Sequence, residues 1–441
     1  MKKFLKHIVV WILNLESRLI LKKYKPEIIA ITGSVGKTSA KEAVYAVLSQ
    51  KFSVRKSEKS HNSELGVPLT LIGEANPWYS PLGWLGVILK GISLILKRQK
   101  GNNGLRVDKG VNYPQKIILE MGADRPGDMA KLAYFRPSVV LVTAIGEVPA
   151  HVEFFAGPED VAKEKAKLVE GLDAQGWAVL NGDDDVVLDM KEKTKGRLLT
   201  YGFGEGLDLR ASEYKLMYHA GERPEGATFK IDYAGSSVPV RIINSFGKQN
   251  VYAVLAGAAA GIIYGMNLVE IAESLNKYSA PAGRLKLIEG EKEVWILDDT
   301  YNASPQAMHA AIDVLKDLPA KRKIAVLGDM LEIGKFTIQS HQKVGDQIKG
   351  AVDIVITCGP RAKFIAQELL DHGFAPAKVI SVSDSREAGL ELEKIIQPGD
   401  LILVKGSQAI RMERAVEEIM AHPEKKSELL VRQEPEWLNK E

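Results

Sequence analysis

Cysteine is almost absent from this chain. Its 441 residues include a single cysteine, Cys358, so no internal disulfide can form. A protein without disulfides is typical of a reducing compartment, and we therefore expect this one to work in the cytoplasm. Cys358 follows the mainly apolar run 352–357 and no motif surrounds it, which argues against a catalytic thiol.

A strong charge bias and a long apolar run are missing as well. The formal net charge is +3, which is too small to indicate nucleic acid as a partner. The apolar residues 8–13 follow a basic start, but no small-residue cleavage site follows them and the stretch is too short to span a membrane. The length predicts two or three domains, and 45% apolar residues are ordinary for a soluble globular protein.

Two apolar stretches carry an excess of positive charge. Residues 1–25 contain seven Lys and Arg against one acid, Glu16, and residues 76–100 contain four against none. We predict a basic amphipathic helix over 1–27 and a second over 81–97, inside an insertion at about 76–112. Such helices either lie on a membrane surface or pack against the protein and each other, and the sequence leaves both alternatives open. Peripheral contact with the inner membrane face is therefore a hypothesis.

The alternation of strand and helix patterns predicts an α/β fold. Short β-branched runs separated by helical patterns indicate a parallel sheet across 28–180, followed by an antiparallel stretch at 207–243. A Pro, Ala and Gly stretch at 279–283 indicates a hinge, and the polar last twenty residues indicate a frayed helix or tail. The predicted domains are a central P-loop ATPase domain with a parallel sheet (28–280) and a C-terminal Rossmann-like domain (281–441).

The strongest local motif is GSVGKTS at 33–39, between a predicted strand and a predicted helix. Backbone N–H groups of such a loop converge on phosphate oxygens, and the helix N-terminus adds a favourable dipole. We expect Lys37 to neutralise β- and γ-phosphate charge and Thr38 to hold Mg²⁺. Ile31 stands where the usual signature has its first glycine. The predicted nucleotide contacts are Gly33, Ser34, Gly36, Lys37, Thr38 and Ser39.

A series of further motifs resembles the Mur ligases, the ATP-dependent enzymes that build the peptide of the bacterial cell wall. The resemblance covers roughly residues 28–415 and is closest to the MurF type, which adds D-alanyl-D-alanine to a UDP-muramoyl tripeptide. The motifs are TGSVGKT (32–38), NSELGVPLT (62–70), EMGA (120–123), AHVE (150–153), NGDD (181–184), GKQN (247–250), DDTYNASP (298–305), LGDMLEIG (327–334) and VKGS (404–407).

This resemblance implies an ATP-dependent ligase that activates a carboxylate as an acyl phosphate and couples it to an amine. It also implies two magnesium ions, one held by Thr38 and Glu120 and the other by His151 and a carbamylated lysine. The matching lysine is Lys165, although Lys163 and Lys167 are near enough for the alignment to slip. The implied catalytic residues are Lys37, His151 and Lys165.

The resemblance extends to contacts with both substrates. The implied ATP contacts are Asn250, Arg284, Asp299 and Asn302, and the implied contacts with the muramoyl-peptide and dipeptide substrates are Asn62, Asp329, Glu332, Lys405 and Ser407. Purely structural interpretations stay open for some of them. Asn250 fits a helix cap, Lys405 a solvated surface lysine, and Asp329 and Glu332 ordinary loop acids.

Three departures from the family pattern leave the acceptor open. Only 27 residues precede the first predicted strand, where the family has a domain for the UDP-sugar, so we expect that module to be missing or supplied otherwise. Gln249 and Ala253 stand where the family has histidine and asparagine. The alternatives are another amide ligase of the superfamily, of the folylpolyglutamate or cyanophycin type, and a scaffold that binds nucleotide without catalysis.

Overall fold

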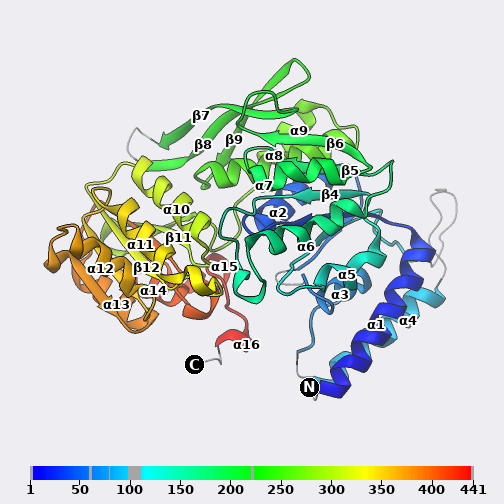
Figure 1. Cartoon of the computed structure of the whole chain (residues 1–441), viewed down its shortest axis with the longest axis horizontal. Helices are drawn as coiled ribbons and strands as arrows, with labels where there is room; N and C mark the ends of the chain where they lie inside the picture. The colour runs from blue at the N-terminus through cyan, green and yellow to red at the C-terminus, as the bar shows by residue number, and fades with distance from the viewer. Residues whose placement is uncertain (1–2, 59–61, 79, 98–110, 220–222, 439–441) are drawn as a thin grey trace.

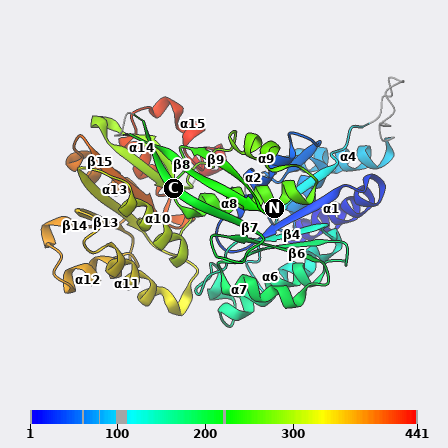
Figure 2. The same ribbon diagram turned by 90° about the horizontal axis from the view of Figure 1, so that it is seen from above.

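The computed structural model describes residues 3–58, 62–78, 80–97, 111–219 and 223–438. In this part of the chain two largely parallel sheets lie side by side, with helices against their faces (Figures 1 and 2). The phosphate loop follows a strand of the first sheet, and the strands of the second sheet come from the chain after residue 285. The predicted α/β class, a P-loop domain followed by a Rossmann-like domain, is confirmed.

The first sheet has the strand order β2-β3-β1-β4-β5-β6-β7-β8-β9. Its first six strands are parallel, and β7 to β9 extend the sheet as an antiparallel meander, which the alternating sequence predicted. β1 lies between β3 and β4, so the loop after β1 opens at the centre of the carboxyl edge. The strands are β1 (Glu27–Thr32), β2 (Val54–Lys56), β3 (Lys116–Glu120), β4 (Val139–Val142), β5 (Trp177–Asn181), β6 (Arg197–Gly202), β7 (Leu209–His219), β8 (Arg223–Tyr233) and β9 (Ser236–Ile243).

The helices of the first sheet pack closely where their side chains are small. A methyl group on Gly257 of α8 would lie 2.9 Å from the backbone of Ala43 on α2, so the two helices meet backbone to backbone. This explains the Ala-rich composition of α8. The helices are α2 (Lys37–Leu48), α3 (Gly66–Ile72), α5 (Asp128–Leu132), α6 (Pro158–Glu170), α7 (Asp185–Leu188), α8 (Lys248–Ile263) and α9 (Leu268–Leu275).

The second sheet has the order β10-β11-β15-β12-β13-β14, with β10 antiparallel to the rest. Parallel pairing of β11 with β15 sets Asp299 beside Lys405 at the carboxyl edge. Cys358 ends β13, where burial raises its thiol pKa to about 12 and keeps it protonated. The elements are β10 (Lys286–Glu289), β11 (Trp295–Asp299), β12 (Arg322–Gly328), β13 (Ile354–Cys358), β14 (Val379–Val382), β15 (Asp400–Lys405), α10 (Pro305–Asp317), α11 (Thr337–Ile348), α12 (Lys363–Asp371), α13 (Ser385–Ile395) and α14 (Glu413–Ile419).

The two sheets share a buried apolar junction. Val152, Val161 and Phe246, from the first part of the chain, belong to the same core cluster as Leu285 and Val314. The residues on either side of the junction are therefore held at fixed distances from one another in this structure.

The N-terminal helix and the insertion helix pack on each other. α1 (Lys3–Tyr24) and α4 (Pro81–Leu96) lie side by side, and both contact α3 (Figure 1). Lys23 Nζ donates to the carbonyls of Leu94 (3.0 Å) and Ile95 (2.7 Å) at the end of α4, where a cation is favourable. The alternative in which the two helices pack on each other is confirmed, whereas residues 98–110 of the insertion lie outside the described residues. Among the helices of the described residues, none has the length and apolarity needed to cross a bilayer.

The expectation of a frayed C-terminal tail is wrong for the described residues. The segment carries α15 (Lys426–Leu429) and α16 (Pro435–Leu438) and returns to the second sheet. The reason is Arg432, which is 6% exposed, donates to Glu413 Oε2 at 3.1 Å and to the Tyr301 carbonyl at 3.0 Å. A polar composition could not reveal this buried ion pair.

Candidate active site

The phosphate loop depends on two glycines. A Cβ on Gly33 would lie 2.0 Å from Thr143 Oγ1 at the end of β4, so no larger residue fits there. Gly36 caps α2 in the left-handed region with φ 87°, which side chains disfavour. Lys37 begins the helix and donates to the Gly33 carbonyl at 2.9 Å, so its ammonium lies over the loop. The loop therefore has the strand–loop–helix arrangement that the motif predicts.

Several polar groups around this loop fit a polyphosphate. Ser34 Oγ and Arg284 Nε are buried without a hydrogen-bond partner among the described residues. Burial lowers the pKa of the Lys37 ammonium, and a phosphate anion beside it would stabilise the charged form. Arg284 stacks on the Tyr301 ring at 4.1 Å and lies 3.5 Å from Thr38 Oγ1. A residue from the second half of the chain thus reaches the phosphate loop.

Glu120 lies where the carboxyl ends of two neighbouring strands meet. It ends β3 opposite Ile31 of β1, and Thr38 Oγ1 donates to its Oε2 at 3.2 Å. Lys41 Nζ lies 3.5 Å from the same oxygen and its side chain is 1% exposed. The sequence analysis missed Lys41, although its position one helical turn after Thr38 places both on the same face of α2. A hydroxyl beside a carboxylate is a suitable donor set for magnesium.

His151 lies between two acids. Its Nδ1 is 2.6 Å from Glu332 Oε2 and its Nε2 is 3.5 Å from Asp124 Oδ1. The contact with His151 is the main reason why the pKa of Glu332 lies below its ordinary value. Glu332 belongs to the second half of the chain, and its carbonyl also accepts from the Glu153 amide at 3.2 Å. The sequence analysis missed Asp124, which follows the EMGA motif directly.

Lys165 is the buried lysine of α6. Its side chain is nearly inaccessible, whereas Lys163 and Lys167 are exposed and pair with Asp160 and Glu164. Burial and then the positive charge of Lys37 lower the pKa of Lys165 to about 7. An amine with this pKa is about half neutral at pH 7, and its neutral form can act as a nucleophile. Of the three neighbouring lysines, the geometry favours Lys165 as the reactive one.

Lys405 and Asp299 form a buried ion pair. Lys405 Nζ donates to Asp299 Oδ2 at 2.6 Å and to the Asn302 carbonyl at 2.9 Å. The interpretation of Lys405 as a solvated surface lysine is wrong, because the residue is 1% exposed. The surface interpretation was open because the sequence does not show that parallel pairing of β11 with β15 brings Asp299 beside Lys405.

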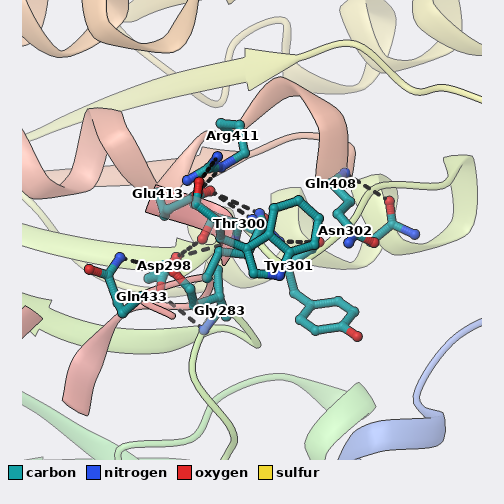
Figure 3. A network of polar contacts seen from close by, with 12 residues as sticks. Gly283, Asp298, Thr300, Tyr301, Asn302, Gln408, Arg411, Glu413 and Gln433 are labelled. Atoms are coloured by element: carbon teal, nitrogen blue, oxygen red, sulfur yellow. Dashed lines mark hydrogen bonds and ion pairs between the residues drawn. The ribbon is translucent and has the colours of Figure 1, made fainter. Parts of the chain in front are cut away.

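A polar network joins the segment at Gly283, just before Arg284, to the loop that carries Tyr301 and Asn302 (Figure 3). Asp298 accepts from the Gly283 amide at 3.0 Å and from the Thr300 hydroxyl at 2.6 Å. Burial raises the pKa of Asp298 to about 6. Gly283 has φ +68°, and a Cβ there would lie 2.9 Å from the Tyr301 amide. Gly283 therefore allows two segments of the chain to approach closely.

Asn250 is buried and bonded within the protein. Its Nδ2 donates to the Phe246 carbonyl at 2.9 Å and its Oδ1 accepts from the Tyr278 hydroxyl at 3.2 Å. The helix-cap interpretation is wrong, because Gly247 caps α8. A separate small cavity beside the phosphate loop is lined by Gln249, Tyr252 and Ala253 of α8.

Asp329 and Ser407 support neighbouring loops. Asp329 Oδ1 accepts from the amides of Arg361 (2.9 Å) and Ala362 (2.7 Å), and Ser407 Oγ accepts from the Leu331 amide (2.8 Å). Asp329 is buried, which an ordinary loop acid would not be. Both residues hold the loop that carries Glu332 in place.

Two connected cavities lie between the sheets. The first, here called the phosphate cavity, encloses about 220 Å³, and the second, the adjoining cavity, encloses about 510 Å³. Both are lined by Asp124, His151, Asn302 and Gln408, so the two spaces meet beside His151. The phosphate cavity is also lined by Ser34, Lys37, Asn62, Glu120, Arg284 and Tyr301, and the adjoining cavity by Glu332, Ser407, Arg411 and Trp437.

The sequence is similar to known amide ligases. The UDP-N-acetylmuramoyl-tripeptide–D-alanyl-D-alanine ligase of Bacillus subtilis (strain 168) is 28% identical over 411 residues, which cover 92% of this chain and 79% of that protein. The enzyme of the same name from Escherichia coli (strain K12) is 28% identical over 398 residues, covering 88% and 76%.

Solved structures of MurF ligases are similar to this structure. MurF from Acinetobacter baumannii superimposes with a TM-score of 0.73 at 26% identity, over 92% of this chain and 79% of that chain. MurF ligase from Thermotoga maritima, in complex with ADP, has a TM-score of 0.73 at 25% identity, over 93% and 83%. Folylpolyglutamate synthase from Mycobacterium tuberculosis shares the fold, with a TM-score of 0.62 at 14% identity.

Two family models match the chain directly. The Mur ligase middle domain matches residues 105–261, and the Mur ligase, glutamate ligase domain matches residues 283–408. Together they cover well over half of the sequence and include Glu120, His151 and Arg284 of the phosphate cavity, whereas the phosphate loop lies before the first matched range. This chain belongs to the Mur ligase family.

Proposed function

We propose that this protein joins D-alanyl-D-alanine to the carboxylate of a muramoyl tripeptide in peptidoglycan synthesis, with hydrolysis of ATP. One observation carries the proposal: Lys37, Glu120, His151 and Arg284 line a single cavity between the sheets. An anionic nucleotide and a carboxylate can approach each other only where cations offset their repulsion, and this cavity supplies them.

The reaction divides into two balanced steps. In the first, a carboxylate oxygen of the tripeptide forms a bond to the γ-phosphorus of ATP, the bond to the bridging oxygen breaks, and ADP leaves. In the second, the amine of the dipeptide attacks the acyl carbon, phosphate leaves, and the amine loses a proton. We assign Lys37 and Arg284 to the transferred phosphoryl group, because they face the phosphate cavity from opposite sheets.

Magnesium ions complete this proposal. Thr38 and Glu120 would hold one ion, and His151 with Lys165 would hold a second, with Asp124 as a further oxygen donor near His151. Such ions, when bound, supply positive charge between the phosphates and the carboxylate. The buried, partly acidic lining of the phosphate cavity supports this role.

We propose that Lys165 is carbamylated. The neutral Nζ attacks the carbon of carbon dioxide, an N–C bond forms, an electron pair moves to oxygen, and a proton leaves to solvent. The product is an anionic oxygen ligand where an ammonium would repel Lys37. The burial of Lys165 and its pKa of about 7 support this assignment.

The remaining assignments follow the two cavities. Asn302 and Asn62 line the phosphate cavity, and Glu332 and Ser407 line the adjoining cavity, which we assign to the dipeptide. Asn250, Asp299, Asp329 and Lys405 are buried and bonded to protein groups, so we assign them to positioning. We place the domain boundaries at 1–27, 28–280 and 281–441 and the reaction in the cytoplasm, with peripheral contact at the inner membrane face.

The experiment is phosphate release from ATP and Mg²⁺ with UDP-muramoyl tripeptide, with and without D-alanyl-D-alanine. Release that requires both substrates, with a pentapeptide product by mass spectrometry, supports the proposal. Release that needs glutamate instead would favour a folylpolyglutamate-type ligase, and nucleotide binding without product would favour a scaffold. Lys165→Ala should lower turnover by about a hundredfold, and Lys163→Ala on the exposed face of α6 is its matched control.

A further inference from the structure

Exposed apolar side chains concentrate on the paired helices α1 and α4. Ten of the eighteen large apolar side chains that the described residues expose belong to α1, α4 or Trp78 just before α4. Elsewhere in the described part of the chain such residues are scattered, as is normal for a soluble surface. The ten residues are Ile8, Trp11, Leu15, Leu19, Trp78, Leu82, Leu85, Leu89, Ile92 and Leu96.

These residues form one stripe along each helix. On α1 the exposed apolar positions recur every three or four residues from Ile8 to Leu19, and on α4 from Leu82 to Leu96. This is the spacing of a single helical face. The opposite faces, with Leu13 and Ile20 on α1, belong to the core of the first sheet. The stripes are therefore the outward faces of two helices that already rest on the protein, and packing among the described residues does not cover them.

The exposed charged side chains that the two helices themselves carry are positive. Arg18 and Lys22 are exposed beside Leu15 and Leu19, and Lys97 is exposed at the end of α4. The only acid on either helix, Glu16, is 4% exposed and points into the α1–α4 contact, where a Cβ on Gly91 would lie 2.2 Å from its carboxylate. Lys6 and Lys90 contact Glu64 and Glu74, which lie outside both helices.

We propose that the outward face of α1 and α4 binds an anionic lipid surface, with both helices lying in the plane of the membrane interface. Apolar side chains that alternate with lysine and arginine suit the boundary between headgroups and acyl chains, where Trp11, at 67% exposure, has its preferred environment. A second copy of the chain would bring Arg18 and Lys22 against like charges, so self-association through this face is disfavoured. This inference is independent of the ligase reaction.

The test is flotation of the full chain with vesicles, without nucleotide or substrate. We expect the protein to float with vesicles of phosphatidylcholine and phosphatidylglycerol, and to float at least about tenfold less with phosphatidylcholine alone or in high salt. The variant Leu85→Glu/Leu89→Glu should lose binding at least about tenfold. The matched control is Val269→Glu/Leu390→Glu, which places two acids at exposed apolar positions far from these helices and should float like the wild type.

Thermal unfolding and light scattering distinguish a loss of lipid binding from misfolding or a change of oligomeric state. Thermal unfolding of both variants should match the wild type, because all four side chains are exposed. Light scattering should show the same mass for wild type and Leu85→Glu/Leu89→Glu. Failure of the wild type to float, equal flotation with neutral vesicles, or a dimer that the Leu85→Glu/Leu89→Glu variant dissociates would each overturn the proposal. Phosphate release by the Leu85→Glu/Leu89→Glu variant should be unchanged, so failure here is distinguishable from failure of the ligase assignment.

Discussion

Lys165 on α6 and Lys405 at the end of β15 are both almost completely buried, on opposite sides of the junction between the sheets. Lys405 has Asp299 at 2.6 Å, whereas no acid of the described residues lies within ion-pair distance of Lys165. Burial and then the positive charge of Lys37 lower the pKa of Lys165 to about 7. The difference teaches that burial alone does not assign a role: a paired lysine holds structure, and an unpaired one is ready for chemistry.

The largest effect should come from Lys37, the cation whose charge also lowers the pKa of Lys165. Lys37→Ala removes the ammonium over the phosphate loop, and we expect phosphate release to fall by about a hundredfold to a thousandfold. Steady-state kinetics with both substrates measure it. A loss below about tenfold would mean that Lys37 does not stabilise the transferred phosphoryl group. Lys163→Ala, at an exposed lysine of α6, should leave the rate unchanged.

Lys165→Ala should lower turnover by about a hundredfold, because a second metal ligand is lost. Wild-type activity in bicarbonate-poor buffer should fall as the pH drops below about 7, since protonation of Lys165 prevents carbamate formation. Added bicarbonate should restore it, and a ¹³C-labelled carbamate signal should appear in the wild type and not in the variant. A labelled signal that persists in Lys165→Ala, or activity indifferent to bicarbonate, would contradict the assignment.

Removal of the positive charge should change the free energy of unfolding in opposite directions at Lys405 and Lys165. Lys405→Met leaves Asp299 buried without a partner and should cost about 3–5 kcal/mol in urea unfolding. Lys165→Met removes a buried ammonium and should stabilise the protein in bicarbonate-free buffer. Because the folded-state pKa of Lys165 lies below its unfolded value, the wild type's penalty is full below about pH 7 and is lost as the pH rises to about 10.5. Equal destabilisation by both variants would contradict the claim that the two buried lysines have different roles.

Glu332→Gln should have the smallest effect. It weakens the contact that orients His151 from the second sheet, and we expect the magnesium concentration for half-maximal activity to rise about tenfold. Glu153→Gln, next to the same contact but with its amide rather than its side chain bonded to Glu332, is the control. An unchanged magnesium dependence in Glu332→Gln would remove His151 from the metal site.

Residues that belong to continuous motifs could be located from the sequence, and their partners could not. The loop 33–39 follows β1 and Glu120 ends β3, where parallel sheets gather functional groups, and His151 belongs to a continuous motif in the segment after β4. Lys41 and Asp124 lie close to these residues, but no motif includes them, and only the helical spacing from Thr38 indicates that Lys41 faces Glu120. The sequence motifs place Asn250 and Lys405 near the site, but they do not predict their hydrogen-bond partners. The Tyr278 hydroxyl and the Asp299 carboxylate come into contact with them only when the chain folds. Arg432 in the C-terminal segment was missed for the same reason.

The measurement that tests the central claim most directly is trapping of the activated carboxylate with hydroxylamine. Incubation with ATP, Mg²⁺ and UDP-muramoyl tripeptide, without dipeptide, should form a tripeptide hydroxamate in the wild type and none in Lys37→Ala. Hydroxamate that depends on ATP and on Lys37 is the result that an acyl phosphate predicts. Formation of the pentapeptide in a parallel reaction with D-alanyl-D-alanine, without any hydroxamate trapped in its absence, would contradict the acyl phosphate mechanism.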